Sequence, residues 1–232
     1  MPDERQQYLQ VVRTYLLARR AWWLLAVMVT IGGIVGVWGS LEAPTPTAAG
    51  SAGATVQFWR LLAVGAGSLP VLTLASPLAN LEAAGAGPFH RLRSIVLGLA
   101  FLLSSASILT ATAIGVDGAA MLLIARALPA WFGLALLSGR ILGWTHSWIL
   151  PWATLCVMIY WGHSGNPGQY HWWEFTAQPL HHLPSALLAG SLFAAGLLAY
   201  TLSSWRLHRL RHTSDDRLTE SDPSKTGPHS IV

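Results

Sequence analysis

One polar loop holds the residues whose types could carry out metal chemistry. They lie between positions 162 and 183: His163, His171, Glu174, His181 and His182. Imidazole nitrogens and carboxylate oxygens are common ligands of zinc and copper. The candidate metal ligands are His171, Glu174, His181 and His182, but the intervals between them are loose. The sequence therefore predicts no bound metal and no cofactor, and it keeps these four residues as candidates.

The aromatic residues of the same loop favour a different interpretation. Tyr170, Trp172, Trp173 and Phe175 lie among the histidines, and such side chains gather at membrane–water interfaces. We therefore expect an interfacial loop whose aromatic side chains enter the outer headgroup region. A half-inserted, re-entrant element is the other interpretation, and it requires that protein cover its backbone.

Arg126 is the one charge that lies well inside a long apolar run. A cation near the middle of a bilayer costs several kcal/mol unless it reaches the interface or faces a polar interior. Pro129 follows one turn later and leaves a backbone carbonyl without its helical partner. One interpretation is that Arg126 and Pro129 line a translocation path. The favoured alternative is a structural arginine that pairs with a carbonyl or with Asp117.

A second polar segment, from Ser76 to Arg93, reads SPLANLEAAGAGPFHRLR. Its Ser-Pro start can cap a short helix along the inner face of a membrane. Such a helix is suited to docking a cytosolic partner, and the residues expected to do so are Leu78, Leu81, Glu82, Arg91 and Arg93. The alternative is a plain connector, although a segment of this length is long for one.

Sequence motifs for enzymatic chemistry are missing. Lys225 is the only lysine, so the phosphate-binding pattern GxxxxGK[ST] is absent. Neither GxSxG nor HExxH occurs, which leaves no motif for a catalytic serine or a zinc protease. We predict that the chain is not an enzyme and has no catalytic residues. The net charge of +4 comes from arginines that flank apolar runs, so membrane rather than nucleic acid is the expected partner.

The elements that must position these residues are membrane spans. Of the 232 residues, 53% are hydrophobic and 10% are charged, whereas soluble domains are about one quarter charged. The chain is predicted to be an all-α, polytopic membrane protein with an amphipathic segment over 1–20, a transmembrane domain over 21–205 and a disordered cytoplasmic tail over 206–232. The six spans are expected at 21–40, 58–75, 95–114, 119–137, 148–161 and 184–202, and residues 42–53 are expected to form a flexible loop.

The arginines predict the orientation of the six spans. With the N-terminus in the cytosol, twelve basic residues fall on the inner side: Arg5, Arg13, Arg19, Arg20, Arg91, Arg93, Arg140, Arg206, Arg209, Arg211, Arg217 and Lys225. Only Arg60 and Arg126 remain outside this set. The positive-inside rule then predicts that both termini are cytoplasmic. The expected location is the plasma membrane.

Small residues on the first two spans predict close helix packing. Gly32 and Gly36 form a GxxxG on the first span, and Gly65 with Ser68 adds small residues to the second. Such positions allow either packing within the chain or contact with a second copy.

This layout resembles the membrane subunits of ABC-2-type exporters. Three segments carry the resemblance: 4–20 before the first span, 76–93 between the second and third, and 162–183 between the fifth and sixth. The stretches SPLANLEA and ARALPAWFGLALLSGRILG also resemble actinobacterial membrane proteins labelled as permeases. The resemblance implies a separate cytosolic ATP-binding subunit that docks on 76–93, and a homodimer or a heterodimer with another permease.

The sequence leaves two other classes of function open. The first is a membrane scaffold, immunity or regulatory protein that uses the same six helices without transport. The second is a metal- or haem-binding membrane protein built on the histidines of the loop at 162–183.

Overall fold

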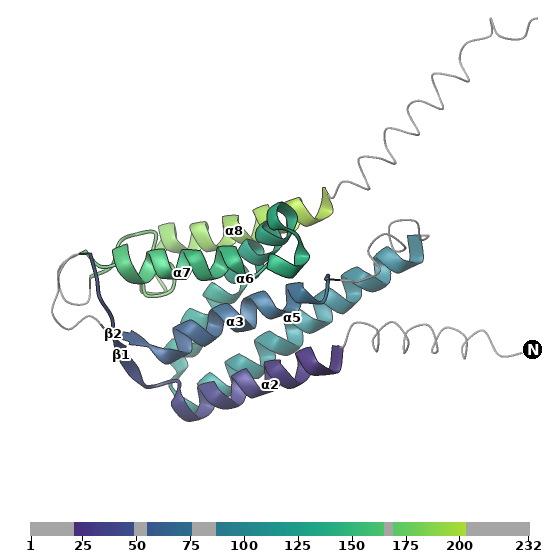
Figure 1. The fold of residues 1–232 in the computed structure, drawn as a ribbon. Coiled ribbons are helices and arrows are strands. Elements are labelled where there is room, and N and C mark those ends of the chain that lie inside the picture. The colour runs from purple at the N-terminus through teal and green to yellow at the C-terminus, as the bar shows by residue number, and fades with distance from the viewer. Residues whose placement is uncertain (1–20, 49–54, 76–86, 165–168, 203–232) are drawn as a thin grey trace, which may run out of the picture.

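The computed structural model describes residues 21–48, 55–75, 87–164 and 169–202, and this part of the chain is mostly helical (Figure 1). The amphipathic segment predicted over 1–20 and the tail predicted over 206–232 lie outside the described residues. The α-helices are α2 (Ala21–Trp38), α3 (Phe58–Leu72), α5 (Gly87–Gly115), α6 (Gly118–Leu142), α7 (Ile149–Trp161) and α8 (Leu183–Thr201), with a short 3₁₀ helix, η1 (Trp144–His146).

Helix α5 begins well before the predicted span. The loop was expected to continue to Arg93, but the helix already starts at Gly87. Pro88 is compatible with a helical first turn, because proline lacks only an N–H that would have no helical partner there. The last residues of the predicted docking segment are therefore the first turns of α5.

The connection after α2 is also more regular than predicted. Strand β1 (Glu42–Pro44) pairs antiparallel with β2 (Thr55–Gln57), and the Thr55 hydroxyl donates to Glu42 Oε2 over 2.9 Å. The prediction of a flexible loop from residue 42 onward is therefore wrong for its first residues. The sequence did not predict these short β-strands, because a Pro- and Ala-rich composition is unfavourable for strands.

Three helices in the described part of the chain are long and apolar enough to cross a membrane. They are residues 91–115 of α5, the whole of α6 and α8. Helices α2 and α3 are also apolar but shorter over their described side chains, and α7 has 13 residues. Helices of this length and composition are typical of a membrane protein.

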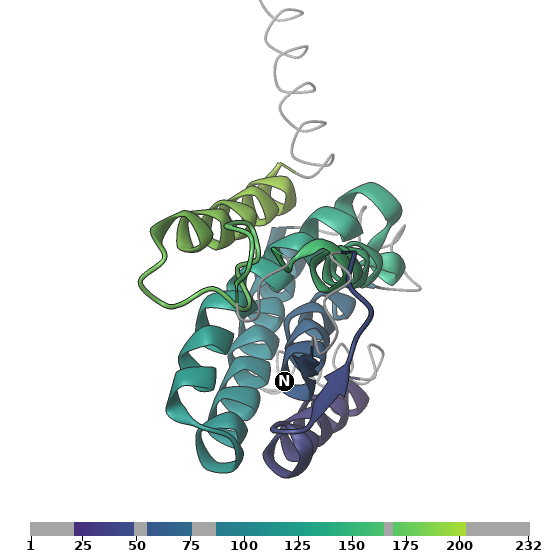
Figure 2. The ribbon, with the colours of Figure 1, turned by 90° about the vertical axis from the view of Figure 1, so that its left-hand side faces the viewer.

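The helices run alternately in opposite directions along one bundle (Figure 1). We call the end at which α2 and α5 begin the basic end, because Arg91, Arg93 and Arg140 lie there. We call the opposite end the cap end. Helix α6 packs against α3, α5, α7 and α8, and Figure 2 shows α8 at the edge of the bundle. Most of α6 is consequently buried, whereas most of α8 is exposed.

Glycines allow two of the helix crossings to be close. A Cβ on Gly32 would collide with Ser107 of α5, and one on Gly115 would collide with the backbone of Gly36. The predicted GxxxG of the first span therefore packs within the chain, against α5. The crossing of α6 and α8 depends in the same way on Gly133 and Gly196, whose backbones touch each other.

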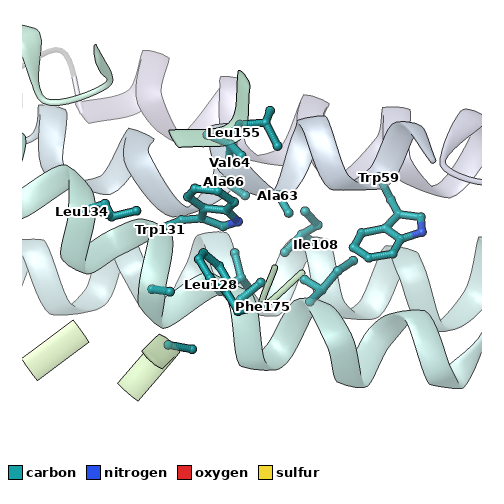
Figure 3. Packing of buried hydrophobic residues seen from close by; sticks show 14 of the residues in the cluster. Trp59, Ala63, Val64, Ala66, Ile108, Leu128, Trp131, Leu134, Leu155 and Phe175 are labelled. Atoms are coloured by element: carbon teal, nitrogen blue, oxygen red, sulfur yellow. The ribbon is translucent and has the colours of Figure 1, made fainter. Parts of the chain in front are cut away.

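The bundle core is filled by large apolar side chains. Figure 3 shows Trp131 of α6 near Phe175, with Val64 and Leu155 on the other side of the indole. The Trp131 and Phe175 rings are 5.0 Å apart between centroids. A second cluster toward the basic end contains the rings of Phe101, Phe132 and Phe193. The core therefore extends along the bundle and includes a residue from the loop between α7 and α8.

Candidate functional site

The loop between α7 and α8, which we call the cap (residues 162–182, of which 162–164 and 169–182 are described), is held by several hydrogen bonds. His171 N–H donates to the Gly162 carbonyl over 2.9 Å, and Gln178 N–H donates to the Glu174 carbonyl over 3.2 Å. The Gln178 side-chain amide donates to the carbonyls of Tyr170 and His171. These bonds satisfy backbone groups that a helix or sheet would otherwise have to pair.

A buried ion pair anchors the cap to α3. Arg60 Nη2 lies 2.6 Å from Glu174 Oε1, and the two side chains are 5% and 1% exposed. The Thr176 hydroxyl oxygen accepts from Arg60 Nε over 3.1 Å and from Nη2 over 2.6 Å. The same hydroxyl donates to Glu174 Oε1. Arginine, threonine and glutamate thus form one closed network. The Tyr170 ring lies over the guanidinium, with 5.9 Å between Arg60 Cζ and the ring centroid.

A second arginine fixes the cap to α6. Arg126 Nη2 donates to the carbonyls of Phe175 and Gln178 over 2.8 and 2.5 Å, and Nη1 donates to the carbonyl of Pro179 over 2.9 Å. Asp117, the other partner considered for Arg126, instead caps α6 by accepting from the N–H groups of Ala119 and Ala120. Arg126 therefore has the carbonyl-paired, structural arrangement.

The two translocation-path candidates sit beside the filled core. Pro129 lies inside α6 and is half-buried. The helix turns around it carry Leu128 and Trp131, which are both fully buried in the apolar cluster. In the described part of the chain these residues border packed side chains, and Arg126 points to the cap.

The four candidate metal ligands are placed in different surroundings. Glu174 is bound to Arg60, and His182 caps α8 through its ring Nδ1 and the N–H of Ser185. His171 is exposed and stacks on Trp173, and His181 is exposed. Among the described residues no three histidine, cysteine or acidic side chains are grouped so as to hold a metal ion.

The aromatic residues of the cap divide between core and surface. Phe175 is completely buried and Trp172 is 58% exposed, while Trp173 is half-buried. The prediction that all four aromatic side chains enter the headgroup region is therefore wrong for Phe175. It packs on Trp131 because the cap folds back onto α6, which the loop's own sequence does not indicate.

His163 lies beside the ion pair and next to Tyr170, with ring centroids 4.9 Å apart. Burial lowers the pKa of the His163 imidazole below its usual value, and the positive charge of Arg60 lowers it further. Glu174 and the backbone carbonyl of Ile159 act in the opposite direction. The cap therefore favours a neutral imidazole at this position.

At the basic end, the predicted docking residues fall into two groups. Leu78, Leu81 and Glu82 lie outside the described residues. Arg91 is exposed. Arg93 turns back to the bundle: its Nη2 donates to the Leu74 carbonyl over 3.2 Å, and its guanidinium lies 5.4 Å from the Trp144 ring centroid.

Sequence reasoning missed Arg60 as a site residue, although a signal was present. Arg60 and Arg126 are the two basic residues that the orientation rule left on the wrong side. Glu174 is the only acidic residue between 162 and 183. Arg60, a basic residue that breaks the orientation rule, and Glu174, the single carboxylate of the loop at 162–183, therefore predict an ion pair, since an unpaired buried charge is costly.

Comparisons of the chain with models of protein families, with curated proteins and with solved structures find no match.

Proposed function

We propose that the chain is the membrane-spanning permease subunit of an ABC-type exporter, powered by a separate cytosolic ATP-binding subunit. In this proposal all six helices cross the plasma membrane, both termini are cytoplasmic, and the cap faces outward. Two permeases, identical or different, and two ATP-binding subunits make up the complex. The segment 76–93 takes up the motion of the ATP-binding subunits and passes it to α3 and α5.

The observation that carries the proposal is the charge difference between the two ends of the bundle. Arg91, Arg93 and Arg140 lie at the basic end, as the cytoplasmic side requires. At the cap end, Arg60 and Arg126 both bind the cap internally. The two exceptions to the positive-inside rule are thus accounted for by local partners, which supports the predicted orientation.

The packed core supports a route between subunits rather than through one chain. Trp131, Leu128 and Phe175 fill the middle of the described bundle. A substrate would therefore pass along a surface that is completed by a second permease. This agrees with the dimer that the resemblance to ABC-2-type exporters implies.

Topology is tested by labelling single cysteines in a Cys156→Ala background with a membrane-impermeant reagent. The reporter positions are Glu82, Ser214 in the tail and the exposed His171 of the cap. We expect Glu82 and Ser214 to react from the cytoplasmic side and His171 from the outside. Labelling of Glu82 and Ser214 from opposite sides would refute the six crossings.

Partner docking is tested by copurification of an ATP-binding protein with charge-reversed variants. Arg91→Glu and Glu82→Lys are expected to abolish copurification while insertion in the membrane is kept. Arg140→Glu is the matched control, because Arg140 is also exposed at the basic end but lies outside the docking segment. If the topology holds and no ATP-binding protein copurifies even with the unchanged chain, the exporter assignment fails and the scaffold class replaces it.

A further inference from the structure

His163 occupies a position in the cap that no part of the proposed transport cycle uses. It pairs with Tyr170 in an isolated antiparallel bridge, so that the two limbs of the cap meet at this histidine. Its ring touches the Tyr170 ring, and the other neighbour of that ring is the Arg60 guanidinium. Glu174 packs close by, since a Cβ on Gly162 would lie 2.8 Å from Glu174 Cγ.

The charges around His163 are balanced only while its imidazole is neutral. From α3 it is faced by Arg60, from the cap by Glu174 and the Tyr170 ring, and from α7 by the Ile159 carbonyl. Arg126 of α6 binds the cap carbonyls of Phe175 and Gln178. The other cap histidines are the exposed His171 and His181 and the helix-capping His182.

Protonation of His163 would place a second cation next to a network that has one carboxylate. Glu174 Oε1 is already engaged by both Arg60 and Thr176. Its Oε2 is buried and has no hydrogen-bond partner in the described part of the chain. His163 Nδ1 is buried and has no hydrogen-bond partner among the described residues. An N–H at Nδ1 would find an acceptor by moving toward Oε2 or toward water, and either movement strains the bridge to Tyr170.

We propose that His163 is a proton-binding site through which acidification of the compartment outside loosens the cap. The switch changes how firmly the cap is held on α3 and α6. It requires the cap to face outward, but it does not depend on an ATP-binding partner.

The sign of the pH effect follows from the environment of the imidazole. Burial and Arg60 lower the pKa of His163 below the ordinary value of 6.5 in the closed cap. An opened cap returns it toward that value, so the open form binds protons more readily. The closed cap is therefore fully stable above about pH 6.5, loses stability as the pH falls, and stops losing it below the lowered pKa.

The test is hydrogen–deuterium exchange of the full chain in lipid nanodiscs at about pH 7.5 and about pH 5.5, which bracket the imidazole titration. Exchange is read from peptides that cover residues 170–180 and is corrected for the intrinsic effect of pH. We expect protection to fall several-fold at the lower pH in the unchanged protein. His163→Gln removes the titration and should show no fall. His171→Gln, an exposed histidine of the same cap, should behave like the unchanged protein.

Three results would overturn the proposal: no change in the unchanged protein, a fall that persists in His163→Gln, or a fall that His171→Gln abolishes. If His163→Gln opens the cap at every pH, the shape of the pH dependence in the unchanged protein decides. Cap protection must begin to fall near about pH 6.5 and must stop falling at the pH at which the His163 ring resonances of the closed protein titrate. A loss of cap protection that occurs without a change in the His163 ring resonances would refute the histidine switch.

Discussion

Replacement of Glu174 by alanine gives the sharpest test of how the cap is held. Arg60 Nη2 would lose a carboxylate oxygen at 2.6 Å, and the guanidinium is only 5% exposed. Thr176 would remain as a neutral acceptor. A buried cation without its counterion must either stay desolvated or force the cap open to reach water.

The expected magnitude follows from the burial of the pair. Breaking a buried ion pair by removing one partner costs about 3–5 kcal/mol, whereas an exposed pair contributes about 1 kcal/mol or less. Both Arg60 and Glu174 are buried, so the larger range applies. Since the cap can release the arginine by opening locally, the loss should appear first as faster exchange of the cap amides.

The assay combines two measurements on purified protein. Unfolding by a denaturing detergent in mixed micelles gives the global change, and hydrogen exchange of residues 170–180 gives the local one. Glu42→Ala is the matched control, because Glu42 is exposed and accepts only the Thr55 hydroxyl among the bonds described for it. The double variant Arg60→Met/Glu174→Leu should recover most of the loss, since it leaves no unpaired charge.

Two outcomes would refute this reasoning. If Glu174→Ala costs no more than Glu42→Ala in both measurements, the ion pair does not hold the cap. If the double variant is as unstable as Glu174→Ala, the loss comes from packing around the glutamate and not from the uncompensated charge of Arg60.

Three further substitutions test the rest of the framework. Gly133→Ala should destabilise the bundle by about 1–3 kcal/mol, because its Cβ would lie 2.6 Å from Phe193 Cα, whereas Gly98→Ala, with nothing within 4 Å, should be neutral or stabilising; thermal unfolding of the two compares them. Asp117→Ala removes the N-cap of α6 and should cost about 1 kcal/mol in the same measurement. If stability is unchanged, the N-cap hydrogen bonds of Asp117 do not stabilise α6. Arg126→Gln should increase exchange in the cap but not at the basic end, with a loss of about 1.5–3 kcal/mol for a charge-assisted hydrogen bond.

The helices could be predicted from sequence because their signals are local. Apolar runs predict the positions of the helices, and capping residues predict their ends. Asp117 caps the start of α6, and Gly143, at φ +94°, ends it. The predicted fifth span differs from α7 by one residue at its start, and the predicted sixth span differs from α8 by one residue at each end. The largest difference is the start of α5 at Gly87. Residues 87–93 do not form an apolar run, so hydrophobicity alone does not predict that they belong to the helix.

The cap could not be predicted because its bonds join residues that are far apart in sequence. Arg60 and Glu174 are separated by 114 positions, and Arg126 reaches carbonyls about 50 positions away. Neither periodicity nor a local motif reports such pairs. Composition alone made the histidines look like the chemical residues of this loop, whereas the glutamate that was grouped with them is the partner of an arginine on α3.

The length of α7 explains why the cap needs two arginines. Its 13 residues span about 20 Å at 1.5 Å per residue, whereas the hydrocarbon core of a bilayer is about 30 Å thick. If α7 crosses the membrane as proposed, the part of the cap around Phe175, which packs on Trp131, lies at hydrocarbon depth. Irregular backbone is tolerated there only when protein covers it and satisfies its polar groups. Arg126 occupies three cap carbonyls, and Arg60 neutralises the buried Glu174. In the proposed topology, the two basic residues at the cap end would therefore permit a non-helical segment to complete a crossing that α7 leaves short.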